Sequence, residues 1–177
     1  MFKKLVLTAL TIVFGFLFYV ASRPSHFEVA RELEVQAPAE KIFPFINNSK
    51  LANDWMPWKD SDPEVRMSYS GPDEGVGSTS SWESSGHMGT GKAEVVVSEK
   101  NKSVKTQLTY TKPMAMTQLA EVSLTPTATG TRVRWQVSGE SNFMGRLMCV
   151  FMNMDKMVGG EFEKGLSRLK TMVEKPL

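Results

Sequence analysis

The sequence predicts an α+β fold: a curved antiparallel sheet of about seven strands, two short helices and a long C-terminal helix, preceded by an N-terminal hydrophobic helix. Three observations support this prediction. Residues 5–21 carry no charge, residues 65–137 largely alternate between apolar and polar side chains, and residues 143–173 repeat apolar side chains every three or four positions. Alternation is typical of strands with one solvated face, and the longer repeat is typical of an amphipathic helix.

The first 22 residues predict a hydrophobic anchor or a signal segment. The uncharged stretch 5–21 is close to the length that crosses a bilayer. Lys3 and Lys4 precede it and only Arg23 follows closely, which favours a cytoplasmic amino terminus and a C-terminal domain on the exported side. That side is the periplasm if the source is a Gram-negative bacterium. A cleaved signal peptide and secretion are the alternative, although no A-x-A pattern stands before a cleavage point near Ser22.

The remainder predicts a linker at residues 23–26 and one domain at residues 27–175. The whole chain holds 21 Lys+Arg and 19 Asp+Glu, and two of the lysines precede the hydrophobic stretch, so the domain is balanced in charge. A balanced domain without a basic run argues against nucleic-acid binding. Cys149 is the single cysteine and there are two histidines, so no internal disulfide, metal cluster or cofactor is expected.

The start of the domain predicts one strand and two short helices. Residues 27–35 alternate between apolar and polar side chains, interrupted only by Arg31, as in a half-buried strand. Residues 37–40 (Ala-Pro-Ala-Glu) are typical of a helix start. Pro44 is expected to kink or end this helix, because it lacks the N–H donor and crowds the preceding turn. A second short helix is expected at residues 50–55.

Six further strands are expected, joined by short turns. They fall near residues 65–69, 76–82, 86–97, 104–110, 116–124 and 133–137. Consecutive strands with short connections predict an antiparallel meander with one solvated and one covered face. A twisted sheet of this size curls, so a helix across its concave side would enclose a space.

The C-terminal pattern predicts one helix over residues 143–173, about 46 Å long at 1.5 Å per residue. Its methionines predict a pliable apolar wall. Gly159 and Gly160 lie within the helix and cost about 2 kcal/mol relative to two alanines. A kink or a close approach of the backbone to the sheet or to a ligand would explain this pair.

Several short sequence motifs occur along the chain in the same order as these predicted elements. They are residues 37–43, Trp55-Met-Pro-Trp58, Tyr69-Ser-Gly-Pro72, residues 75–78, Trp82, residues 130–135 and residues 157–166. Together they resemble the START-like superfamily, and more narrowly its polyketide cyclase and lipid-transport (SRPBCC, helix-grip) group, over about residues 27–174. The resemblance implies a cavity between sheet and long helix that binds lipids, sterols or aromatic polyketides, with cyclisation in some members. The N-terminal anchor and Pro44 depart from the family pattern.

The candidate ligand-binding residues are those expected to line this cavity: Trp55, Trp58, Trp82, His87, Tyr110, Trp135, Met148, Phe151, Met154 and Phe162. The tryptophans are equally typical of core packing. His87 lies between Gly86 and Gly89 and could serve as a general acid or base if it faces inward, but these glycines also permit a bulge that turns it outward. No catalytic constellation is apparent around it.

These observations predict a membrane-anchored protein that holds an apolar small molecule, lipid-like or polycyclic. Its partners would be that molecule and the membrane, through residues 5–21, with no cofactor and no metal. Two alternatives remain open. One is a cyclase or dehydratase acting on an apolar substrate in the same cavity, and the other is a protein-interaction module that holds no ligand.

Overall fold

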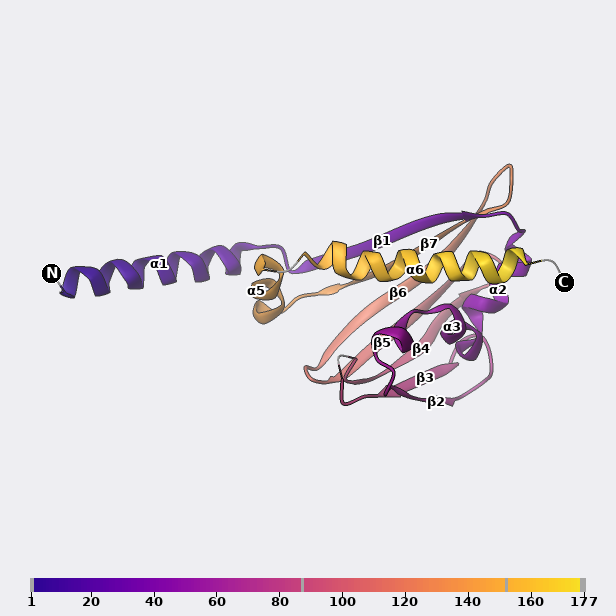
Figure 1. Cartoon of the computed structure of the whole chain (residues 1–177), viewed down its shortest axis with the longest axis horizontal. Helices are drawn as coiled ribbons and strands as arrows, with labels where there is room; N and C mark the ends of the chain where they lie inside the picture. The colour runs from indigo at the N-terminus through magenta and orange to yellow at the C-terminus, as the bar shows by residue number, and fades with distance from the viewer. Residues whose placement is uncertain (1, 87, 152, 176–177) are drawn as a thin grey trace.

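The computed structural model describes residues 2–86, 88–151 and 153–175, and Figure 1 shows their arrangement. The strands are β1 (His26–Val35), β2 (Arg66–Ser70), β3 (Thr79–Glu83), β4 (Thr90–Glu99), β5 (Ser103–Lys112), β6 (Met116–Pro126) and β7 (Thr131–Glu140). The helices are α1 (Phe2–Ser22), α2 (Ala39–Asn47), α3 (Ser49–Trp55), α4 (Trp58–Ser61), α5 (Phe143–Phe151) and α6 (Met154–Glu174).

The strands form one antiparallel sheet in the order β1-β7-β6-β5-β4-β3-β2. Strands β2 to β7 follow each other as a meander, and β1 closes the far edge by pairing with β7. The segment with α2, α3 and α4 therefore carries the chain from one edge of the sheet to the other. α6 lies along β1, and α1 projects away from the sheet (Figure 1). The predicted fold class is confirmed.

Pro44 was expected to kink or end the first short helix, and the structure excludes the second of these effects. Pro44 lies inside α2, which continues to Asn47, and the Asn48 N–H donates to the Pro44 carbonyl at 3.2 Å. The proline therefore removes one donor without ending the helix. α2 instead ends at Asn48, whose side-chain oxygen accepts from the N–H groups of Lys50 and Leu51 and so starts α3. The four-residue helix α4 was not predicted.

The single C-terminal helix predicted over residues 143–173 is wrong, because the structure has two helices there. α5 ends at Phe151 and α6 begins at Met154. The Oδ1 atom of Asn153 accepts from the N–H of Lys156 at 2.9 Å and caps the first turn of α6. The apolar repeat runs through this break unchanged, so periodicity alone did not reveal the cap.

The core lies between the inner face of the sheet and the helices α2, α3 and α6. Alternate residues of β1 point inward, and Arg31 is on this face with Val29 and Val35. α6 contributes its fully buried side chains Phe162, Leu166 and Leu169. The interruption that Arg31 makes in the first strand thus places a guanidinium group directly beneath α6.

Candidate functional site

The inner face of the sheet follows from the strand register, because residues paired across antiparallel strands share a face. Two runs of paired residues trace this face across the sheet. From β7 to β5 the paired residues are Trp135, Val122 and Val104. From β5 to β2 they are Tyr110, Gly91, Trp82 and Met67. α6 covers β1 and β7, and α2 and α3 contact β6 and β3. The remaining end of the inner face, next to the start of β6, is only partly covered, and Met116 there is 41% exposed.

Four of the candidate residues form an aromatic cluster under α6. Trp135 stacks on Phe162 with ring centroids 4.0 Å apart, and Trp55 meets Trp135 edge-on at 5.0 Å. All three side chains are fully buried, while Trp58 is half-buried at 6.0 Å from Trp135. The indole N–H of Trp55 donates to the Phe45 carbonyl at 2.9 Å. Direct ring contacts therefore fill the space between α6 and β7.

Two further candidates, Trp82 and Tyr110, meet on the partly covered end of the inner face. Their rings are edge-on with centroids 5.3 Å apart, and the indole N–H of Trp82 donates to the Met88 carbonyl at 3.2 Å. Burial raises the pKa of the Tyr110 phenol. A Cβ at Gly91 would lie 2.4 Å from Cζ2 of Trp82, so glycine is needed for the indole to lie across β4.

We call the surface formed by Met67, Trp82, Leu108, Tyr110 and Met116 the open inner face. Its side chains share the concave side of the sheet by register. Leu108 packs against the core cluster and is half-buried, whereas Tyr110 pairs with Met116 beside the turn between β5 and β6. The surface is apolar apart from the phenol and indole groups, so its chemistry suits an apolar molecule.

The remaining candidates are not brought together with this surface. Met148 and Phe151 lie on α5, whose main packing partner is α1. Met154 begins α6, but its side chain lies outside the described part of the chain, as does His87. The structure thus separates the eight candidates whose side chains it describes into a buried cluster, an open surface and a helix beside α1.

An open hollow of about 480 Å³ lies over the β2–β5 end of the sheet. The register puts most of its lining on the outer face, including Arg66, Glu83 and Lys92. Serine and threonine side chains supply much of the rest. This hollow opens on the opposite side from α6 and so differs in position from the predicted apolar cavity.

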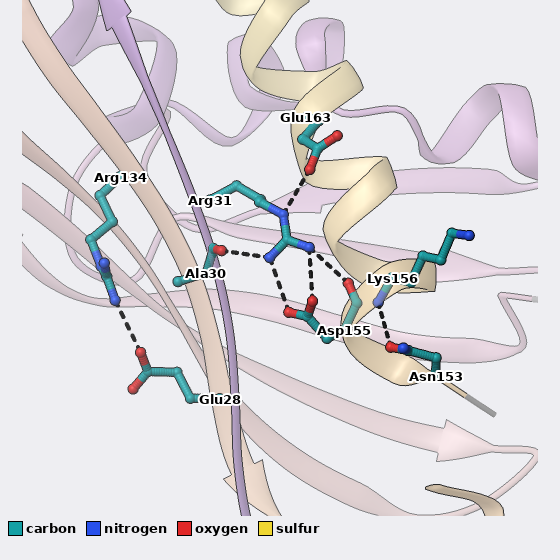
Figure 2. Close-up of polar contacts among 8 residues, drawn as sticks. All are labelled: Glu28, Ala30, Arg31, Arg134, Asn153, Asp155, Lys156 and Glu163. Carbon is teal, nitrogen blue, oxygen red and sulfur yellow. Dashed lines mark hydrogen bonds and ion pairs between the residues drawn. The ribbon is translucent and has the colours of Figure 1, made fainter. Parts of the chain in front are cut away.

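Arg31 makes five hydrogen bonds, and four of them join β1 to α6 (Figure 2). Its Nη1 and Nη2 atoms each donate to one carboxylate oxygen of Asp155 at 3.0 Å, and its Nε donates to Glu163 at 2.8 Å. Nη1 also donates to the Ala30 carbonyl and Nη2 to the Asp155 carbonyl. The planar guanidinium suits this bidentate geometry, and together with the bond to Glu163 it fixes the first three turns of α6 over the middle of β1.

Gly159 makes room for this contact. A Cβ at Gly159 would lie 2.1 Å from Nη2 of Arg31, whereas a Cβ at Gly160 would have no neighbour within 4 Å. The expected close approach at the glycine pair is therefore confirmed at Gly159, where the neighbour is a side chain of the sheet. Nothing in the structure explains Gly160.

The pairing also makes stability depend on pH. Hydrogen bonds and charge from Arg31 lower the pKa of Asp155, whose unfolded value is about 3.9. A lowered pKa contributes stability above the unfolded value, and the contribution is lost as pH falls through the folded value. We expect the native chain to lose more stability than Asp155→Asn when the pH falls below about 4. Urea midpoints at pH 7, 4 and 3 measure this difference. In an Arg31→Met background, Asp155→Asn should leave the pH dependence of stability unchanged. If Asp155→Asn also leaves it unchanged in the native background, the Arg31–Asp155 pair is not its cause.

Sequence reasoning missed the Arg31 contacts and a buried carboxylate, Asp62. A charged residue on the apolar side of a strand was the available signal for Arg31. Asp62 follows α4, is buried, and accepts from Ser84 Oγ at 2.8 Å and from the Met88 N–H at 3.1 Å. It therefore ties the segment after β3 to the end of α4, and no spacing in the sequence indicated this.

A curved seven-stranded antiparallel sheet that holds a C-terminal helix on its concave side defines a helix-grip protein. A model of the family described as polyketide cyclase / dehydrase and lipid transport matches residues 26–174. The chain belongs to this family, which confirms the resemblance seen in its local signatures. A search of curated proteins returned no match.

Solved structures share the fold at low sequence identity. Protein MLL2253 from Mesorhizobium loti has a TM-score of 0.62 and 17% identity, over 85% of this chain and 100% of that one. The Aha1 dimer from Colwellia psychrerythraea has a TM-score of 0.59 and 20% identity, over 84% and 96%. The di-domain ARO/CYC protein BexL from the BE-7585A biosynthetic pathway has a TM-score of 0.61 and 12% identity, over 89% of this chain and 53% of that one.

Proposed function

We propose that the chain is a membrane-anchored binding protein that holds an apolar small molecule, lipid-like or polycyclic, on the open inner face beside α6. The observation that carries this proposal is the incomplete cover over Trp82, Leu108, Tyr110 and Met116. Trp82 is buried, Leu108 and Tyr110 are half-buried and Met116 is 41% exposed, so cover decreases towards the start of β6. All four side chains lie on the concave face of the sheet, within a fold whose family includes lipid transport. Apolar surface left open on one side of a core is typical of a ligand-binding groove.

Burial supplies the binding energy in this proposal. Each methylene removed from water contributes about 0.8 kcal/mol, so ten methylenes contribute about 8 kcal/mol before the cost of immobilising the ligand. A charged anchor is therefore not required. The edge-on pair Trp82–Tyr110 offers aromatic surface as well, which suits a ring system as readily as an acyl chain.

The anchor in this proposal is α1. It is long and apolar enough to cross a membrane or to act as a signal sequence. All of its described residues except Phe16 and Val20 are exposed, so α1 lies outside the core of the domain. At its end, Tyr19 accepts a hydrogen bond from Arg23 at 3.1 Å, and tyrosine and arginine are common at the membrane–water boundary. The domain at residues 27–175 would then stand on the exported side, after the linker at residues 23–26.

The proposal is tested by the ligand that accompanies the purified full chain. We expect native mass spectrometry in detergent to show an apolar adduct that Leu108→Gln reduces about tenfold or more, because the substitution removes about 1.5–3 kcal/mol of apolar contact. The matched control is Gln107→Ala, since Gln107 is exposed on the outer face of the same strand. Equal occupancy in both variants, or a native chain that is always empty, would contradict the proposal.

A further inference from the structure

α5 is an apolar helix with an exposed apolar face. Met144, Met148 and Phe151 are 51%, 43% and 75% exposed, and their spacing of four and three residues puts them on one stripe. None of the residues of α5 is buried. Its one charged residue, Arg146, is directed to the end of α1, where Nη1 donates to the carbonyls of Ala21 and Arg23 at 3.0 and 3.1 Å. The exposed stripe therefore carries no charge.

α5 is docked mainly on α1. The rings of Phe16 and Phe151 have centroids 6.1 Å apart, and Val20, one turn from Phe16, is buried. Figure 1 shows α5 beside the end of α1, at the end of the domain from which α1 projects. Capping of the last carbonyls of α1 by Arg146 is favourable, because a cation complements the carboxyl end of a helix.

The position of the Phe16–Phe151 contact along α1 indicates that lipid surrounds α5. Phe16 precedes Arg23 by seven residues, which corresponds to about 10 Å along the helix axis. If Tyr19 and Arg23 lie at the membrane–water boundary, Phe151 reaches below that boundary beside Phe16. Amphipathic helices that lie in the interface bury their apolar face to about 5–10 Å, which agrees with this depth.

Exposed methionines continue the apolar surface of α5 towards the open inner face. Asn142, which precedes α5, contacts the Met114 sulfur at 3.9 Å in the turn between β5 and β6. Met114 and Met116 are both exposed. We call Met114, Met116, Met144, Met148 and Phe151 the lipid-facing rim. Methionine moulds to irregular apolar surroundings, which suits contact with acyl chains.

We propose that α5 lies in the headgroup–acyl boundary of the bilayer that α1 spans, and that the lipid-facing rim seats the open inner face against the lipid surface. The inference rests on the proposed role of α1 as an anchor. An apolar molecule would then move between bilayer and binding face along the rim, with no passage through bulk water. A second copy of the chain or a protein partner over α5 is the outcome that would overturn it.

The test uses the full chain in vesicles of phosphatidylcholine and phosphatidylglycerol, with Cys149→Ser as background. Single cysteines at Thr11, Met148 and Lys100 are labelled in turn with an environment-sensitive fluorophore, and brominated lipids serve as quenchers. Thr11 lies within α1, Met148 on the exposed stripe of α5, and Lys100 is exposed in the turn between β4 and β5. We expect quenching at Thr11 by lipids brominated deep in the chain, quenching at Met148 by lipids brominated near the headgroup, and none at Lys100.

The outcomes separate this inference from the proposed anchor. Quenching at Thr11 with no quenching at Met148 overturns the placement of α5 and leaves the anchor intact. No quenching at either position overturns both. A blue-shifted Met148 probe that lipids do not quench shows a protein surface over α5 and also overturns the inference. Adding Met144→Asp one turn away should reduce quenching at Met148 but not at Thr11, because a charge in the interface opposes insertion.

Discussion

Replacing Trp135 by alanine is expected to lower the free energy of unfolding by about 3–5 kcal/mol. Trp135 is fully buried between Phe162 of α6 and Trp55 of α3, with one stacked and one edge-on ring contact. Its removal leaves a cavity where β7, α3 and α6 meet, and these elements cannot all move inward to close it. Because small domains have total stabilities of about 5–15 kcal/mol, this loss is a large share of the whole.

The measurement is urea denaturation of the full chain in detergent, followed by far-UV circular dichroism. Trp58→Ala is the matched control, because Trp58 contacts the same ring at 6.0 Å but is only half-buried. Its expected cost is about 1–2 kcal/mol, in proportion to the smaller area it buries. Equal costs for the two variants would contradict the assignment of Trp135 as the centre of the cluster.

The fold was predictable because it depends on side-chain periodicity, and the sequence is clear in this respect. A largely alternating pattern of apolar and polar side chains marked the strands, and short turns at residues such as Gly71 and Asn101 implied the antiparallel order. The break between α5 and α6 was not predictable in the same way. It depends on whether Asn153 caps a new helix or faces solvent within a continuous one, and both choices leave the apolar repeat intact.

The candidate site was predictable only in part, because periodicity assigns a side chain to a face but not to a neighbour. Trp82 and Trp135 both point inward, yet Trp135 meets two other rings and Trp82 borders the partly covered surface. Phe151 continued the apolar repeat of the C-terminal segment, but the break at Asn153 separates it from the helix that covers the sheet. The partners of Arg31, Asp155 and Glu163, were likewise not predictable, since β1 and α6 are more than a hundred residues apart in the chain (Figure 2).

Replacing each of three glycines of α6 by alanine in turn is expected to change the free energy of unfolding in three different ways. Gly160→Ala should raise the free energy of unfolding by up to about 1 kcal/mol, because alanine favours the helix and the new methyl meets nothing within 4 Å. Gly165→Ala should lower it by about 1–2 kcal/mol, because overpacking costs about 1–3 kcal/mol and exceeds the helical gain. The new Cβ at this position would lie 2.9 Å from Cζ3 of Trp135 and 3.3 Å from Cδ of Pro57.

Gly159→Ala is the most specific test of the three, because the neighbour of the new methyl group is a hydrogen-bonded side chain. The new Cβ would displace the Arg31 guanidinium from Asp155 and Glu163, so the variant should be less stable than Gly160→Ala despite the same gain in helix propensity. The double variant Arg31→Ala/Gly159→Ala isolates the cause. Without the guanidinium, Gly159→Ala should stabilise as Gly160→Ala does, and urea midpoints at pH 7 measure both changes. If Gly159→Ala remains unfavourable in the Arg31→Ala background, Arg31 is not what requires glycine in α6.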